Sequence, residues 1–259
     1  MTETTMTEEL KTFLIFLIWL FSAYFGSFSS WGVSVLSVGL LTVLWLSPQL
    51  ASITFKLGKI GDILWGLYLF YKSGHIPKQF IIGGSIVSVL GSFLGSYLIF
   101  SIPDYLIYSV SAVTMITLAI VSYYKKSGWN NMVHISQKRE YIYYVGLFFL
   151  TMIGNLFIAG SGVWYYFINT FIIRLSSLEA KWMAAVLSVF WFIGTFFGIM
   201  ATGKYVISWG IALALGMFIG GYFGTKHIIK LWNEIFRNIL LFSILLFALY
   251  FLYKAFVSF

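Results

Sequence analysis

Six long apolar runs dominate this sequence and decide what the chain can fold into. They lie at residues 50–71, 79–101, 105–124, 177–202, 206–225 and 236–257. A helix of about 20 apolar residues crosses a hydrocarbon core of about 30 Å, and each run has roughly that length. With 60% hydrophobic and only 9% charged residues, the chain also has too little polar surface to cover a water-soluble globule. We therefore predict an all-α polytopic membrane protein.

Residue usage excludes several classes of function. The absence of cysteine excludes disulfides, thiol catalysis and thiolate metal sites. The net charge of +8 comes from Lys and Arg in short connections and not from a long basic tract, so we expect no nucleic-acid partner. The histidines fall in connections, and no phosphate-loop, hydrolase or metal-ligand motif is present. We expect neither an enzyme nor a bound cofactor or metal.

The residues outside the apolar runs predict neither a signal peptide nor a water-soluble domain. The first eleven residues carry Glu3, Glu8 and Glu9 against Lys11, unlike the basic start of a signal peptide, so we expect no cleavable signal. The longest polar stretch, residues 125–140, is too short to bury a core. We therefore place the function within the membrane part.

Two further regions, 12–46 and 141–173, each split into a pair of shorter apolar stretches around small residues. The first break reads Gly26-Ser-Phe-Ser-Ser-Trp-Gly32, and the second reads Gly154-Asn155 and then Ala159-Gly-Ser-Gly162. Apolar stretches of about 10 to 14 residues are more often re-entrant or interfacial than spanning. Each region is therefore a broken helix, which we interpret as a re-entrant pair.

Shifting the chain by 129 residues superposes its second half on its first without a gap. Ser47 falls on Ser176, Ala51 on Ala180 and Gly74 on Gly203. Both broken regions then begin their halves, which indicates a tandem duplication. The predicted repeats are residues 1–128, with broken helix 12–46 and helices 50–71, 79–101 and 105–124, and residues 129–259, with broken helix 141–173 and helices 177–202, 206–225 and 236–257.

The basic residues favour one orientation of the two halves. If each broken region is a kinked spanning helix, the halves are parallel and the basic residues divide nine against five between the two faces. If each is a re-entrant hairpin, the halves are inverted and the division is eleven against three. Because cytoplasmic loops collect positive charge, we favour an inverted repeat in a prokaryotic cytoplasmic (inner) membrane, with the hairpin tips near mid-membrane. The kinked-helix arrangement stays open.

The two breaks form the predicted substrate site. Irregular backbone inside a membrane must face protein or a cavity, and matched breaks in two halves point to a transporter site. The short helix after each break presents unbonded N–H groups and a positive dipole end, which favour an anion. Close helix packing is the alternative role for these small residues. The candidate ligands at the breaks are Ser29, Ser30, Trp31, Gly32, Asn155, Gly160, Ser161 and Gly162.

Three charged residues, Lys56, Lys59 and Asp62, lie inside the run at 50–71. An unpaired charge there costs at least about 2.5 kcal/mol, so each needs a partner or a purpose. We add all three to the candidate substrate site, beside the helix N-termini. In the alternative, Lys56 snorkels to the surface and Asp62 neutralises Lys59. The counterparts in the second half are Ala185, Ser188 and Trp191, so the site is electrostatically lopsided.

Two glycine pairs, Gly91/Gly95 and Gly220/Gly224, have the spacing that lets helices approach closely. We expect them to pack helices within the monomer, with a contact between protomers as the alternative. The sequence leaves open whether the protein is a monomer or a homodimer.

Short motifs along nearly the whole chain carry a family resemblance. They are Leu46-Ser-Pro-Gln-Leu-Ala-Ser-Ile-Thr-Phe-Lys56, Lys72-Ser-Gly-His-Ile76, Ile102-Pro-Asp-Tyr-Leu106, Ala201-Thr-Gly-Lys-Tyr205 and the two glycine pairs. In this order they resemble the sulfite exporter TauE/SafE family, also called toluene-sulfonate uptake permeases. That family usually has a run of glycines at each break, which this chain lacks. The resemblance implies transport of sulfite, sulfoacetate or other organosulfonates, coupled to an ion gradient.

The leading prediction is a secondary transporter that binds a small anion between the breaks while its halves expose the site alternately. Its expected partners are that anion, a coupling ion (proton or sodium) and the lipid bilayer. An anion channel or an accessory subunit of a membrane complex is the alternative. An intramembrane enzyme is a further class, but it lacks a recognisable nucleophile, acid/base pair or metal site.

Overall fold

The structure is a computed structural model, and it is helical throughout the residues that it describes. These are residues 7–26, 32–44, 46–61, 63–64, 68, 80–124, 136–157, 165, 168–169, 172–175, 177–231 and 234–259. Within these ranges the chain forms nine α-helices and a short 3₁₀ helix, and no strand. The all-α prediction is therefore confirmed.

The helices follow the apolar runs closely. Five of the six predicted runs correspond to α5 with η2, α6, α9, α10 and α11. Of the helices described, three contain segments long and apolar enough to cross a membrane: Ile81–Ser101, Met183–Thr202 and Ile207–Gly224. In chain order, the elements are α1 (Glu8–Gly26), α2 (Gly32–Leu44), α3 (Pro48–Gly58), α5 (Ile81–Leu98), η2 (Ile99–Ser101), α6 (Asp104–Tyr124), α7 (Gln137–Leu156), α9 (Ser177–Thr202), α10 (Ile207–Leu231) and α11 (Glu234–Val257).

Helix α5 shows which solvent surrounds the protein. Ile82 and Ile86 are exposed on it, Ile82 by 75%. Ser85, Ser88 and Ser92 are buried. Because residues three and four apart share a helix face, the apolar side points outward and the hydroxyls point inward. Water would favour the opposite arrangement, whereas lipid favours this one, so the fold is that of a multi-pass membrane protein.

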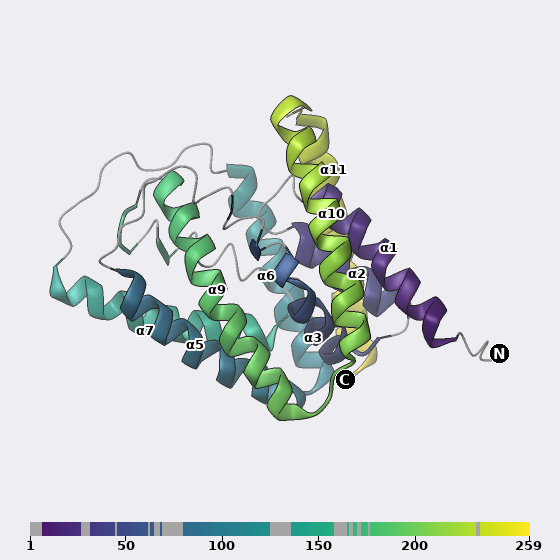
Figure 1. Cartoon of the computed structure of the whole chain (residues 1–259), viewed down its shortest axis with the longest axis horizontal. Coiled ribbons are helices and arrows are strands. Elements are labelled where there is room, and N and C mark those ends of the chain that lie inside the picture. The colour runs from purple at the N-terminus through teal and green to yellow at the C-terminus, as the bar shows by residue number, and fades with distance from the viewer. Residues whose placement is uncertain are drawn as a thin grey trace.

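The helices gather in two groups, with α5, α7 and α9 on one side and α1, α2, α10 and α11 on the other (Figure 1). Helix α1 packs along α10, α7 packs along α5, and α6 packs against α11. Glycines make the first two contacts close. A Cβ added to Gly91 would lie 2.6 Å from the carbonyl oxygen of Phe148 in α7, and one added to Gly220 would overlap the Leu20 carbonyl in α1. Gly91 and Gly220 therefore pack helices within the monomer, as the sequence predicts.

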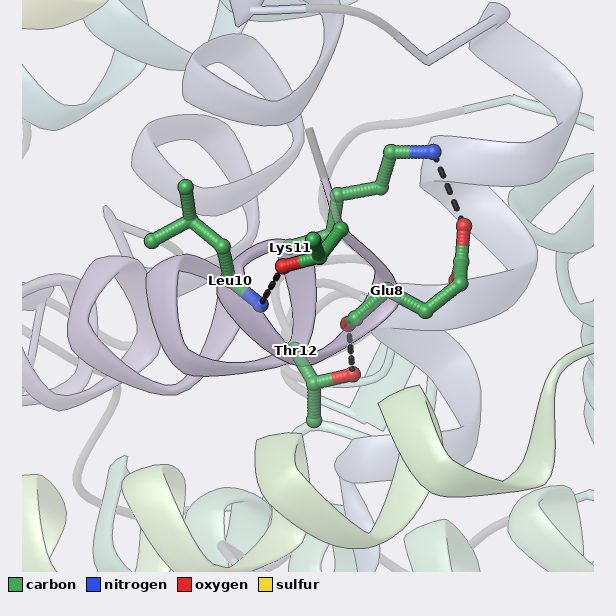
Figure 2. A network of polar contacts seen from close by, with 5 residues as sticks. Glu8, Leu10, Lys11 and Thr12 are labelled. Atoms are coloured by element: carbon green, nitrogen blue, oxygen red, sulfur yellow. Dashed lines mark hydrogen bonds and ion pairs between the residues drawn. The ribbon is translucent and has the colours of Figure 1, made fainter. Parts of the chain in front are cut away.

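The start of α1 is polar and exposed (Figure 2). Leu10 N donates to Thr7 Oγ1 over 3.4 Å, which places Thr7 as the capping residue. Lys11 Nζ lies 2.8 Å from Glu8 Oε1, and Thr12 Oγ1 donates to Glu8 O over 2.8 Å. An exposed ion pair adds about 1 kcal/mol at most to stability, so these contacts cap the start of α1 but contribute little to the stability of the fold.

The continuous helix predicted over residues 50–71 is wrong at Gly58. Helix α3 begins at Pro48, where the Ser47 side chain accepts from Leu50 N, and it ends at Gly58. Lys59 N then donates to Lys56 O over 3.3 Å in a tight turn, and helical residues resume at Ile60. A Cβ on Gly58 would overlap the Leu213 side chain of α10. Glycine weakens a helix, so α3 ends where α10 crosses it.

The two predicted breaks have different outcomes. Helix α1 ends at Gly26 and α2 begins at Gly32, which are the two ends of the first predicted break. At the second, Gly154 and Asn155 belong to the last turn of α7, and the backbone becomes extended at Phe157. The prediction that Gly154-Asn155 opens this break is therefore wrong, because Asn155 donates to Thr151 O inside the helix over 3.3 Å. Residues 27–31 and 158–164 lie outside the described ranges.

Candidate functional site

The candidate site centres on Lys56, in the last turn of α3. Its side chain is 2% exposed and is the one charged side chain found buried among the described residues. Lys56 Nζ donates to the backbone oxygen of Asn155, 99 residues away in α7. Lys56 and Asn155, which the sequence placed in the site from different halves of the chain, are therefore in contact.

The Asn155 side chain ties the end of α7 to two other helices. Its Nδ2 donates to Ser92 O in α5 over 3.2 Å and to Thr195 Oγ1 in α9 over 3.2 Å. The Thr195 hydroxyl in turn lies 3.3 Å from Asn155 Oδ1, to which it donates. Asn155 is fully buried, and unmade bonds would be costly there. The carbonyl that receives Lys56 is thereby held in place by α5, α7 and α9.

The electrostatic setting of Lys56 differs from the predicted one. We predicted the lysines beside helix N-termini, whereas the Asn155 carbonyl lies in the last turn of α7. The negative end of that helix dipole stabilises an ammonium ion. An ammonium group has three N–H donors, and Asn155 O takes one. No second acceptor for Lys56 occurs within the described part of the chain.

Lys59 follows one turn later and lies against aromatic rings. It caps the C-terminus of α3 and is partly buried. Its Nζ lies 5.7 Å from the Phe55 ring centroid and 5.1 Å from that of Trp191 in α9. Trp19 of α1 stacks on the other ring, Phe55, with centroids 5.2 Å apart. The faces of aromatic rings attract cations, so both rings stabilise the Lys59 ammonium.

Each of the two lysines is linked to α9, at positions one helical turn apart. Lys56 reaches Thr195 through Asn155, and Lys59 lies over Trp191. Trp191 and Thr195 are four residues apart, so they share a face of α9. Residues from both halves of the sequence therefore contact the C-terminal end of α3, which carries the two lysines.

The other predicted site residues are largely outside this geometry. Gly32 is the first residue of α2. The Lys59–Asp62 ion pair stays a prediction, because Asp62 is outside the described ranges. The same holds for Ser29, Ser30, Trp31, Gly160, Ser161 and Gly162.

Three residues of the site were missed from the sequence: Ser92, Thr195 and Trp191. A signal existed for Trp191, which lies fourteen residues into the apolar run at 177–202 although Trp gathers at the headgroup level. It is also the repeat counterpart of Asp62. Thr195 had none, because one hydroxyl in an apolar helix usually bonds to its own backbone. Ser92 had none, because it contributes its backbone carbonyl, which any residue could supply.

Comparison with known proteins gives one match. The family described as sulfite exporter TauE/SafE matches residues 15–251, which include Lys56, Asn155 and Thr195. No curated protein and no solved structure matches the chain. The match covers nearly all of the 259 residues, and the lipid-facing helices agree with a family of membrane transporters. The chain therefore belongs to the sulfite exporter TauE/SafE family.

Proposed function

We propose that this protein is a secondary transporter that carries a small anion, sulfite or an organosulfonate, by alternating access. Family membership supports sulfite as the first substrate to test. The observation that carries the proposal is the buried Lys56 ammonium, which has one acceptor, Asn155 O, among the described residues. Its two remaining N–H donors are suited to the oxygens of an anion.

Energetics support a ligand at Lys56. A charged side chain inside the membrane costs at least about 2.5 kcal/mol. A hydrogen bond to a charged group contributes about 1.5 to 3 kcal/mol, so the Asn155 carbonyl offsets the cost without leaving a surplus. A sulfite or sulfonate group has several oxygens on one centre and can fill both remaining donors. Lys59, one turn away, adds a second positive charge.

Helix bounds and packing support two repeats around this site. Helix α1 begins at Glu8 and α7 begins at Gln137, which are 129 residues apart, the offset found in the sequence. Under that offset α10 is the counterpart of α5, so the contact of α1 with α10 is the counterpart of that of α7 with α5. We propose that the halves form an inverted repeat, each with a re-entrant pair, and that relative motion of the halves exposes the site alternately.

The remaining candidate ligands belong to this proposal. We propose that Ser29, Ser30, Trp31 and Gly32 of one half, and Gly160, Ser161 and Gly162 of the other, contribute to the anion site, together with Asp62. A proton or sodium ion supplies the driving gradient. The protein acts in the prokaryotic cytoplasmic membrane, as a monomer or homodimer.

Purified protein provides the test. Thermal unfolding is measured with sulfite, thiosulfate, sulfate, sulfoacetate and carboxylates, because a ligand that binds only the native state raises stability, by about 2.7 kcal/mol at 100 times its Kd. Flux into liposomes then distinguishes mechanisms. A carrier shows saturation and counter-exchange, whereas a channel shows neither, and an accessory subunit transports nothing alone.

Variants connect the function to the site. Lys56→Ala and Lys59→Ala should each weaken anion binding and flux. Lys204→Ala is the matched control, because Lys204 is exposed and its Nζ also lies over a ring, 4.5 Å from the Phe100 centroid. Wild-type flux in both Lys56 and Lys59 variants would remove these residues from the site.

A further inference from the structure

Trp191 has a buried hydrogen-bond donor without an acceptor among the described residues. Its side chain is 1% exposed, and its indole Nε1 has no hydrogen-bond partner in the described part of the protein. The indole N–H can only donate, and a buried Trp usually finds an acceptor for it. No described residue supplies that acceptor, so an oxygen of a ligand could supply it.

The position of Trp191 indicates what that acceptor is. Its ring centroid lies 5.1 Å from Lys59 Nζ, and it shares a face of α9 with Thr195, which hydrogen bonds to Asn155. The Asn155 carbonyl accepts from Lys56. The ring that carries this unpartnered N–H thus lies against one ammonium group and one helical turn from the contacts of a second.

We propose that the Trp191 indole N–H contacts the substrate and, with Lys59, holds one side of the anion whose other side faces Lys56. This inference rests on the proposed transport of an anion. Hydrogen bonds of this kind span about 2.9 Å, so a group with several oxygens on one centre can give each donor its own oxygen, whereas a halide must share one atom among all the donors. The site therefore selects oxyanions such as sulfite and sulfonates over halides.

A purely structural role for Trp191 predicts a different result. In that role its ring packs under Lys59, and a phenylalanine ring would still offer an aromatic face to the ammonium. Trp191→Phe removes the N–H and keeps a ring, so it separates the two roles. Trp209→Phe is the matched control, because Trp209 is 8% exposed in α10 and its indole N–H also has no hydrogen-bond partner in the described residues.

The experiment measures sulfite, sulfoacetate and chloride binding to purified wild type and both variants. We expect Trp191→Phe to raise the Kd for sulfite and sulfoacetate about tenfold and Trp209→Phe to leave it unchanged. Unchanged affinity in Trp191→Phe, or an equal loss in Trp209→Phe, would overturn the inference while the proposed function stands. Wild-type protein that binds chloride as tightly as sulfite would overturn the inference. Wild-type protein that binds no oxyanion would refute both the inference and the proposed function.

A second measurement follows binding in the unaltered protein and uses variants only to assign its resonances, so it does not depend on the affinity of a variant. Among the ten tryptophans, labelled with ¹⁵N at the indole nitrogen, the Trp191 resonance is assigned from Trp191→Phe or from Trp191→Tyr. Saturating sulfite should move this resonance downfield and leave that of Trp209 in place. A Trp191 resonance that stays fixed at saturation would overturn the inference.

Discussion

Replacing Lys56 with Met should strongly weaken anion binding while leaving the folded protein about as stable as before. Methionine has a similar length and no charge, so it fills the buried space beside Asn155. Removing the charge recovers at least about 2.5 kcal/mol of burial cost. Losing the bond to the Asn155 carbonyl forfeits about 1.5 to 3 kcal/mol. The free energy of unfolding should therefore change by no more than about 1 kcal/mol.

Binding should respond far more strongly than stability. Truncating one partner of a buried, hydrogen-bonded charge pair costs about 2 to 5 kcal/mol. The Kd for sulfite in Lys56→Met should therefore rise about thirtyfold or more, since 1.4 kcal/mol corresponds to about a factor of ten. Such a separation of the two effects is what distinguishes a ligand-binding lysine from one that holds helices together.

The assay is thermal unfolding of the variant in detergent, with and without sulfite, followed by sulfite flux in liposomes. Lys204→Met is the control, since this lysine is exposed on the turn after α9. The reasoning is refuted if Lys56→Met keeps saturable sulfite flux at wild-type affinity. It is equally refuted if the variant unfolds well below wild type without anion, because Lys56 would then stabilise the end of α7.

Three further predictions concern packing, a turn and topology. Gly194→Ala should destabilise the protein by about 1 to 3 kcal/mol, because its Cβ would overlap a backbone oxygen of α5. Gly221→Ala, with nothing within 4 Å, should be neutral or stabilise by at most about 1 kcal/mol, and thermal unfolding in detergent compares the two. Gly203→Ala should cost about 1 kcal/mol in the same assay, since the φ of Gly203 is +65°. Thr7→Cys and Ser136→Cys, 129 residues apart in a cysteine-free chain, test the inverted repeat with an impermeant maleimide on sealed vesicles. Labelling of both from the same side would contradict it.

The sequence predicted the helices wherever the signal is local. The apolar run at 177–202 predicted both bounds of α9, and the run at 206–225 predicted the start of α10. Helix α10 continues to Leu231, and α3 starts at Pro48, two residues before the predicted run. The end of α3 at Gly58 was missed, because the close packing of this glycine against Leu213 of α10 is a long-range contact. No pattern within residues 50–71 encodes that crossing, so the run looked like one helix.

In the candidate site, too, the sequence predicted the residues with a local signal and missed the long-range contacts. Lys56 stood out because a charge within an apolar run is costly wherever it lies. Its partner could not be predicted, because the carbonyl of Asn155 is brought to it from 99 residues away. Asn155 was expected to open a break, yet it completes a helix and binds Thr195, a contact that exists only once α7 and α9 have packed together.

The hydrogen bonds of Asn155 also bear on which helices can move relative to one another. Its amide bonds the end of α7 to α9 in its own half and to Ser92 O of α5 in the first half, so the proposed motion of the halves would have to break the bond to α5 or carry α5 along. Among the described residues, Lys56 is held across to α7 by one hydrogen bond alone. In the proposed transport cycle, this single bond is therefore the one of these contacts that breaks most easily, and it lies at the same ammonium group whose two other donors would bind the anion.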